Sequence, residues 1–217
     1  MNTAAKDFRI FWDNAYALHH LVDSPKPVKN ILEACAKAGN ENRPFIFAST
    51  SKVTFAGAGL SYIGASAYNL AFFAKNYSTK SITPNKINQH RHAEFLSKFP
   101  GGVKSLMAKH AEDLKPKFDA IDRILTEYLA GTELAQWTKP EGGYFISLDT
   151  KPGMAKAVIA KAAELGVKLT PAGATWPHGK DPQNQNIRIA PSRPSLADIE
   201  AAAEVLALSI LWVAKNQ

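Results

Sequence analysis

Cysteine, acidic charge and long apolar runs are all scarce in this sequence. Cys35 is the only cysteine among 217 residues, so neither an intramolecular disulfide nor a cysteine-based zinc site can form. Its place in the helical pattern ILEACAKAG favours a buried, inert thiol over a nucleophile. No apolar run reaches the length of a membrane span, and the N-terminal MNTAAKDFRIF lacks the features of a secretory signal. We therefore expect a protein of the reducing cytoplasm with no membrane partner.

Negative charge is in the minority, because Lys and Arg number 26 against 19 Asp and Glu, which gives a net charge of +7. This balance suits anionic partners such as nucleic acid, phosphate cofactors or carboxylates. The basic residues are scattered, however, and no zinc-finger spacing, basic heptad helix or aromatic RNA-binding motif accompanies them. We therefore expect small anionic ligands rather than nucleic acid. The 46% hydrophobic and 21% charged residues fit a folded globular chain and exclude a disordered one.

Apolar segments typical of strands alternate with helical segments in the first part of the chain. The predicted elements are a buried strand at 7–13, a helix at 24–40 entered through Ser24, a buried strand at 43–49, a candidate third strand at 59–66 and a helix at 67–77. Apolar strands that alternate with helices predict a mainly parallel sheet covered by helices on both faces.

The second part of the chain begins with helical periodicity and then becomes mixed. The predicted elements are helices at 85–99 and 101–131, the latter kinked at Pro116, a strand at 142–149, a helix at 154–166, strands at 167–173 and 186–192, and a helix at 195–215 capped by Ser195. The fold class is therefore α/β with an α+β C-terminal part. We predict a large-domain portion at 1–85, bridging helices at 86–131 and a small α+β domain at 132–217.

One lysine stands between small hydroxyl residues and a glycine-rich turn, in the segment STSKVTFAGAGLS at residues 49–61. A lone lysine in a loop is ordinarily a solvated surface residue. Lys52, however, follows a predicted buried strand, where partial burial makes an amine available for Schiff-base chemistry. The hydroxyls of Ser49, Thr50 and Ser51 and the amides near Gly57–Gly59 are groups that bind phosphate. These neighbours favour a covalent lysine beside a phosphate site.

An acid and a phenol follow the first predicted strand in the segment DNAY, residues 13–16. Asp13 and Tyr16 are thereby placed at the carboxyl end of a strand, where open α/β sheets bind ligands. Alternatively, Asp13 caps the next turn and Tyr16 packs. Pyridoxal phosphate needs a carboxylate at its ring nitrogen and gains from a phenol at its ring oxygen, so DNAY fits that cofactor.

Arg188 lies within the alternating strand pattern of the segment NIRIAPSRPS. A guanidinium in that position is explained by bidentate binding of a carboxylate. The alternatives are an exposed strand position and an ion pair with a nearby acid. We interpret Arg193, further along the same segment, as structural or solvent-facing.

Taken in order, the segments DNAY, STSK, GGYF and NIRIAPSRPS resemble the fold-type-I pyridoxal-phosphate-dependent aminotransferases. The likeness is greatest to an aspartate-aminotransferase-type branch often labelled MocR-like, and it runs along nearly the whole chain. It implies a transaminase that moves an amino group between an amino acid and a 2-oxo acid. It also implies pyridoxal 5′-phosphate as the cofactor and a homodimer as the assembly.

The resemblance assigns cofactor-binding roles to matching residues of this sequence. Lys52 is implied to form the Schiff base with the cofactor and to carry the proton during transfer. Asp13 is implied to pair with the pyridine nitrogen, and Tyr16 to hydrogen-bond the ring oxygen. Ser49 and Ser51 are implied to contact the phosphate.

The resemblance also assigns substrate-side roles. Arg188 is implied to grip the α-carboxylate of the amino acid. Tyr144 and Phe145, in the segment GGYF, are implied to lie on the strand that begins the small domain, beside the substrate.

Two departures from the family pattern bear on the site. Many aminotransferases carry a phosphate-clamping arginine where this chain has Leu60. We expect Ser49, Ser61 or backbone amides to hold the phosphate instead, with Arg91 as a candidate replacement. The chain also corresponds only to the C-terminal half of the family. We expect Met1 to be an internal methionine of a longer protein, whose other half supplies further cofactor contacts.

Several interpretations remain open at this point. The chain can be a transaminase or its C-terminal fragment, or a non-catalytic remnant that needs a missing half or a partner. With the same cofactor it can instead catalyse decarboxylation or β-elimination, or serve as a regulator. His19 and His20 are interpreted as exposed loop residues, and the stretch at 90–92 has no acidic spacing that indicates a metal site.

Overall fold

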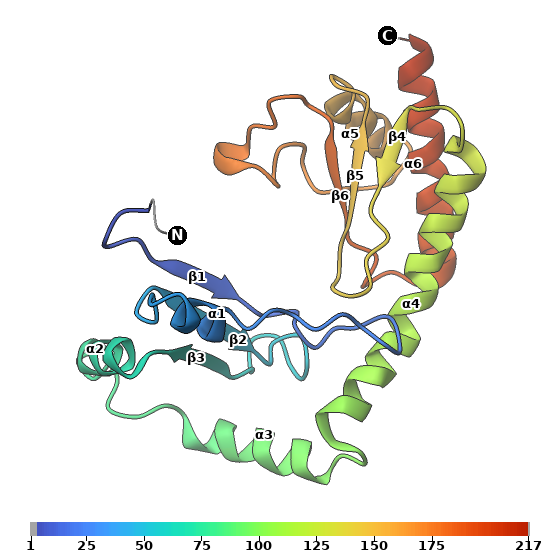
Figure 1. Ribbon diagram of the computed structural model, residues 1–217. Coiled ribbons are helices and arrows are strands. Elements are labelled where there is room, and N and C mark those ends of the chain that lie inside the picture. The colour runs from blue at the N-terminus through green and yellow to red at the C-terminus, as the bar shows by residue number, and fades with distance from the viewer. Residues whose placement is uncertain (1–3, 217) are drawn as a thin grey trace. The chain divides into compact units, whose positions relative to one another are not determined.

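The computed structural model describes residues 4–216, which separate into two compact units. Residues through His20 together with Ser24–Lys109 form the first unit, and Leu21–Asp23 with the residues from His110 onward form the second. The α-helices and β-strands of both units are labelled in Figure 1. The division at residues 85 and 131 that was expected from the sequence stays a prediction about domain boundaries.

The first unit is a three-stranded sheet with helices packed beside it. Its elements are β1 (Ile10–Asp13), α1 (Ile31–Lys37), β2 (Pro44–Ser49), β3 (Ser61–Ala65), α2 (Ala67–Tyr77) and α3 (Lys86–Lys98), followed by α4 (Gly102–Leu129), which continues into the second unit. The two predicted strands, the candidate third strand and the helix at 67–77 are all present. Helix α4 runs through Pro116 without ending, as predicted.

The sheet of the first unit has the order β1–β2–β3 and is mixed (Figure 1). Strand β1 pairs with β2 in parallel, whereas β3 pairs with β2 antiparallel. The prediction of a mainly parallel sheet is therefore wrong for the third strand, although the α/β class is confirmed. The reason lies in the connection from Thr50 to Leu60, which contains no helix, and a parallel crossover needs a helix or a comparably long link.

The first helix is much shorter than the predicted 24–40. It begins after Asn30, whose Oδ1 accepts hydrogen bonds from the amides of Leu32 and Glu33 at 3.1 and 3.3 Å. Ser24 is therefore not the cap. Pro25 and Pro27 keep the preceding residues extended, because a residue before proline avoids the helical region.

Helix α1 covers one face of this sheet. A Cβ built on Gly64 of β3 would lie 2.7 Å from Ile46 Cγ2 and 3.7 Å from Leu32 Cδ1, so β2 and α1 approach that glycine closely. Ile46 and Gly64 are paired across β2 and β3 and thus share a face. The opposite face carries Phe45 and Phe47, and it is this face that bears the candidate site.

The second unit is an antiparallel sheet packed against helices. Its further elements are β4 (Ala135–Trp137), β5 (Ile146–Thr150), α5 (Ala155–Glu164), the short 3₁₀ helix η1 (Pro177–Gly179), β6 (Asn186–Ile189) and α6 (Leu196–Asn216). The sheet order is β4–β5–β6 with both pairings antiparallel. The predicted helices at 154–166 and 195–215 are present. The Ser195 hydroxyl accepts a hydrogen bond from the Asp198 amide at 3.2 Å, as expected of a cap.

Two strand predictions in the second unit need correction. The strand predicted at 142–149 begins only at Ile146, so Tyr144 and Phe145 precede it. Residues 167–173 form no strand and join no sheet of the described chain. Pro171 offers no amide for a ladder hydrogen bond, which explains why the apolar alternation there is not expressed as a strand.

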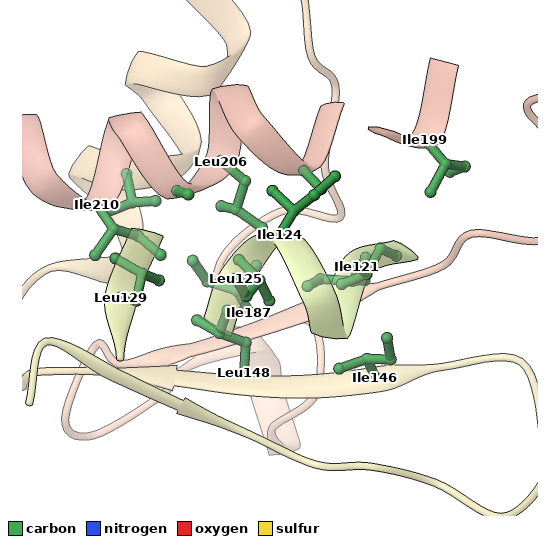
Figure 2. Packing of buried hydrophobic residues seen from close by; sticks show 14 of the residues in the cluster. Ile121, Ile124, Leu125, Leu129, Ile146, Leu148, Ile187, Ile199, Leu206 and Ile210 are labelled. Atoms are coloured by element: carbon green, nitrogen blue, oxygen red, sulfur yellow. The ribbon is translucent and has the colours of Figure 1, made fainter. Parts of the chain in front are cut away.

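The core of the second unit lies between its sheet and the helices α4, α5 and α6. Figure 2 shows the labelled side chains of α4, β5, β6 and α6 pointing toward one another. Leu125 and Leu148 are completely buried, and Ile187 is 1% exposed. Each such side chain contributes about 1.5–3 kcal/mol by leaving water, so this cluster fixes β6 and the residues it carries.

Asp122 on α4 provides a pH-dependent contact within this unit. Its carboxylate accepts hydrogen bonds from Trp137 Nε1 and Lys139 Nζ, both at 2.8 Å. Burial opposes ionisation, but these bonds outweigh it and hold the pKa of Asp122 below its ordinary value of 3.8. A lowered carboxyl pKa stabilises the fold above the unfolded-state pKa, and this stabilisation is lost as the pH falls through the folded-state pKa.

We expect Asp122→Asn to lower the free energy of unfolding by roughly 0.5–1 kcal/mol at neutral pH, and by less at pH 3. Urea unfolding at both pH values measures the difference, with the exposed Glu127→Gln as a control for removing an acid from the same helix. An equal loss at both pH values would contradict the assigned cause.

Candidate functional site

Three polar residues share one edge and one face of the β1–β2–β3 sheet. Asp13 ends β1 and pairs with Phe47, while Ser49 ends β2 and pairs with Ser61, the first residue of β3. Because β1 and β2 are parallel and β3 is antiparallel, all three positions lie at the same edge. Residues two apart on a strand and residues paired across strands face the same side. The fold thus places a carboxylate and two hydroxyls on the face opposite α1.

An open cleft of about 470 Å³ lies at this edge. It is lined by Phe11, Asp13, Ala15, Phe47, Ala48, Ser49 and Ser61. Phe11 and Phe47 meet edge to face with ring centroids 5.7 Å apart. The volume is that of a small-molecule site, and its polar groups gather at one edge of an aromatic floor.

Strand β1 is less buried than predicted. Phe11 is 74% exposed, so the expectation of a strand buried on both faces is wrong for the described residues. Within the described residues of the first unit, α1 packs on the other face of the sheet, beside Ile46 and Gly64. An apolar residue on an uncovered face gives the same sequence pattern as a core residue, and the sequence therefore could not distinguish the two.

Asp13 is held by its own turn. Its Oδ1 accepts a hydrogen bond from the Ala15 amide at 2.9 Å, and the Asn14 amide bonds to the Phe47 carbonyl at 2.7 Å. The carboxylate is thereby fixed in direction as the chain leaves β1. Asp13 therefore caps the turn that follows β1, as the alternative interpretation expected. Its carboxylate is nevertheless exposed and lines the cleft.

Lys52 sits in a hydrogen-bonded turn that follows β2. The amides of Val53 and Thr54 both donate to the Thr50 carbonyl, at 2.9 and 2.8 Å. Two hydrogen bonds between Thr50 and Leu60 close the loop. The Leu60 amide donates to Thr50 Oγ1 at 2.8 Å, and the Thr50 amide donates to the Leu60 carbonyl at 2.8 Å. Leu60, where the resemblance led us to expect an arginine, therefore contributes backbone groups to the loop.

The structure brings Lys52 together with Tyr16. Lys52 Nζ lies 5.1 Å from the centroid of the Tyr16 ring, within cation–π range. Both side chains are partly buried. The phenol from the β1 end and the amine from the β2 end thus meet, although they are far apart in the sequence.

Two serines and a glycine form a compact polar turn beside Lys52. Ser49 Oγ lies 2.7 Å from Ser51 Oγ and accepts a hydrogen bond from the Ser51 amide at 3.0 Å. A Cβ on Gly59 would lie only 2.9 Å from the Ser51 nitrogen, so this close approach requires glycine. Arg91, the suggested substitute for a phosphate clamp, lies exposed on α3.

Arg188 lies on β6 of the second unit, paired with Ser147 of β5. Its guanidinium carbon is 4.8 Å from the centroid of the Phe145 ring, and one Nη donates to Thr170 Oγ1 at 3.4 Å. Its Nε is buried and has no hydrogen-bond partner among the described residues. No acid pairs with this guanidinium in the contacts described, which leaves donors available for a carboxylate. Arg193 is exposed, as expected.

Two buried histidines beside the lysine turn were not recognised from the sequence. His19 and His92 are each only 3% exposed, so the interpretation of His19 as an exposed loop residue is wrong. His19 Nε2 lies 3.2 Å from the Lys52 carbonyl, and His92 Nε2 lies 2.8 Å from Thr54 Oγ1. Among residues 4–216, no group of three or more His, Cys, Asp or Glu could hold a metal ion.

This chain matches the family model described as aspartate amino-transferase across residues 1–217. The chain belongs to the aspartate amino-transferase family. It is 46% identical over 214 residues to the aspartate aminotransferase of Corynebacterium glutamicum, covering 99% of this chain and 49% of that protein. It superimposes on the crystal structure of an aminotransferase from Corynebacterium diphtheriae with a TM-score of 0.96 and 46% identity, over 100% of this chain and 53% of that one.

Membership in this family confirms the resemblance inferred from DNAY, STSK, GGYF and NIRIAPSRPS. The chain described here spans about half the length of the curated relatives it matches. More distantly, it shares the fold of α-aminoadipate aminotransferase from Thermus thermophilus, complexed with N-(5′-phosphopyridoxyl)-L-leucine, at a TM-score of 0.78 and 18% identity. No helix within residues 4–216 is both long and apolar enough to cross a bilayer.

Proposed function

We propose that this chain carries the cofactor-attaching and substrate-carboxylate-binding residues of a pyridoxal-phosphate-dependent aminotransferase that uses aspartate-type amino acids and 2-oxo acids. The observation that carries the proposal is the meeting of Lys52 and Tyr16 beside the edge where Asp13, Ser49 and Ser61 share one face. These are an amine, a phenol, a carboxylate and hydroxyls, and pyridoxal phosphate needs each of them.

The residues present fit that cofactor. The carboxylate of Asp13 at the cleft would hold the ring nitrogen protonated, and Tyr16 would hydrogen-bond the ring oxygen. Ser49, Ser51 and Ser61 would bind the phosphate, together with backbone amides in the turn that Gly59 closes against Ser51. When bound, the cofactor supplies an electron sink that lets the substrate Cα–H bond break.

Lys52 has two tasks in this proposal. Its amine would attach covalently to the cofactor aldehyde and, once displaced by the substrate, would accept and return the Cα proton. The turn through Thr50 sets the direction in which the side chain leaves the backbone. Its position over the Tyr16 ring would keep the amine near the phenol proposed to hydrogen-bond the ring oxygen.

Arg188 would bind the α-carboxylate of the amino acid. A guanidinium with an unpartnered buried Nε has unused donor capacity, and a carboxylate can accept two parallel N–H bonds from it. Phe145 restricts the plane of the guanidinium through the contact at 4.8 Å. The substrate would thus be oriented before the proton is removed, which is how positioning residues accelerate a reaction.

The assembly and compartment are also proposals. We infer a homodimer from the family resemblance, and the cytoplasm from the single cysteine, which is buried as expected. Amino acids and 2-oxo acids are the proposed small-molecule partners.

The proposal is tested by incubating the purified chain with pyridoxal phosphate, reducing it with borohydride and mapping the modified peptide by mass spectrometry. We expect one modified residue, Lys52, and a visible absorbance band before reduction. Amino-group transfer from aspartate to 2-oxoglutarate is then assayed on the same preparation. Attachment at Lys52 without turnover would assign a cofactor-binding fragment, whereas no attachment at Lys52 would contradict the proposal and favour the non-catalytic interpretation.

A further inference from the structure

We propose that His19 is a positioning residue for Lys52, acting through a hydrogen bond from its imidazole Nε2–H to the Lys52 backbone carbonyl; the consequence for catalysis rests on the proposed function. His19 Nε2 and the Lys52 oxygen are 3.2 Å apart, within the range of an N–H···O bond. A carbonyl oxygen can only accept, so the imidazole donates and its Nε2 carries a proton.

The surroundings of His19 make this bond more than a surface contact. The side chain is only 3% exposed, so water does not compete freely for the donor. The ring also meets Tyr16 edge to face, with centroids 5.6 Å apart at an interplanar angle of 67°. His19 therefore contacts both residues that approach one another at the site, the phenol through its ring and the lysine through its backbone.

Through its contacts with Tyr16 and with the Lys52 carbonyl, His19 links the segment that follows β1 to the turn that follows β2. Residues 14–19 follow β1, and the turn at 50–54 follows β2. The His19 amide is itself fixed by the Tyr16 carbonyl at 3.0 Å. Holding the Lys52 carbonyl fixes the peptide from which the lysine side chain departs, and hence the 5.1 Å approach of its ammonium to Tyr16.

His92 secures the same turn from another side but not Lys52 itself. Its Nδ1 donates to the Asn88 carbonyl at 2.9 Å, and its Nε2 lies 2.8 Å from the Thr54 hydroxyl, which donates to the Thr50 carbonyl at 3.1 Å. His92 thus anchors the turn through Thr54, one side chain removed from Lys52. This difference makes His92 a useful comparison for His19.

The test compares three replacements of His19. Glutamine can present an amide N–H close to the position of Nε2, asparagine presents the same group on a shorter side chain, and leucine fills space without a donor. Hydrogen exchange of the Val53 and Thr54 amides, which bond to Thr50, reports opening of the lysine turn. Borohydride-trapped attachment of pyridoxal phosphate at Lys52 reports the consequence for the amine.

We expect His19→Leu and His19→Asn to speed exchange of these two amides roughly five- to tenfold and to slow attachment at Lys52 by a similar factor. His19→Gln is expected to remain within about twofold of the unmodified chain in both measurements. Exchange in α4, monitored at the same time, should not change.

Equal behaviour of all three variants, whether normal or impaired, would overturn the proposal, because the donor would then not matter. If His19→Leu does not fold, the comparison of His19→Gln with His19→Asn still decides, since both replacements carry the same amide. If the unmodified chain attaches no pyridoxal phosphate, the proposed function fails, while the exchange measurement still tests the hydrogen bond from His19.

Discussion

Lys52→Ala abolishes covalent attachment of pyridoxal phosphate to this chain and lowers any amino-group transfer at least about a thousandfold, if the lysine has the proposed role. The amine is the attaching group and the proton carrier, and alanine supplies neither. Borohydride trapping with peptide mapping measures the first effect, and an aspartate–2-oxoglutarate assay measures the second. This is the largest effect expected for a single replacement in the chain.

Lys52→Arg separates the chemistry from the charge. The guanidinium keeps a cation near the Tyr16 ring but stays protonated and cannot attack the aldehyde, so attachment should be lost here too. Lys80→Ala, which removes an exposed lysine of the same unit, should leave attachment intact. Attachment that persists at another lysine after Lys52→Ala would mean that trapping detects surface amines and not a site.

Arg188→Ala is expected to raise the aspartate concentration needed to displace the cofactor from Lys52 at least about a hundredfold. Two charge-assisted hydrogen bonds to the α-carboxylate would be lost, and each is worth roughly 1.5–3 kcal/mol. The measurement is the loss of borohydride-trapped attachment as aspartate is added. It needs no complete catalytic cycle, and it therefore remains informative for a chain of half the relatives' length.

Two variants show whether this effect depends on the guanidinium fork. Arg188→Lys keeps the charge without bidentate geometry and should shift the aspartate requirement by roughly tenfold. Arg193→Ala removes the same charge from an exposed position a few residues later and should have no effect. Equal shifts for Arg188→Ala and Arg193→Ala would indicate a general effect of net charge and would count against substrate binding by Arg188.

Much of the local structure was predictable because its signals are local. The strand at Pro44–Ser49, the helix at Ala67–Tyr77 and the Ser195 cap follow from apolar runs, helical periodicity and a hydroxyl at a helix start. The misses are also physical. Pro25 and Pro27 restrict the first helix to Ile31–Lys37. The alternating segment at 167–173 pairs with no strand of the described residues.

Some residues of the candidate site were recognisable from the sequence and others were not. Residue type marked Asp13, Tyr16 and Lys52, because a carboxylate, a phenol and an amine that follow strand ends have few common explanations together. Arg188 was marked because a guanidinium inside an alternating strand is unusual. His19 gave no comparable signal. A histidine in a loop is usually solvated, and only the folded chain shows that this one is buried against the Lys52 carbonyl.

Residue chemistry and motif order were therefore sufficient to assign this chain to its family, and they select Lys52 as the lysine to test. Tertiary structure alone established that β3 runs antiparallel, which brings Ser61 to the same edge as Asp13 and Ser49. It alone established that Tyr16 and Lys52 meet and that His19 touches both. The reason is that strand direction and long-range contacts depend on pairing between distant segments, and no local pattern of residues encodes that pairing.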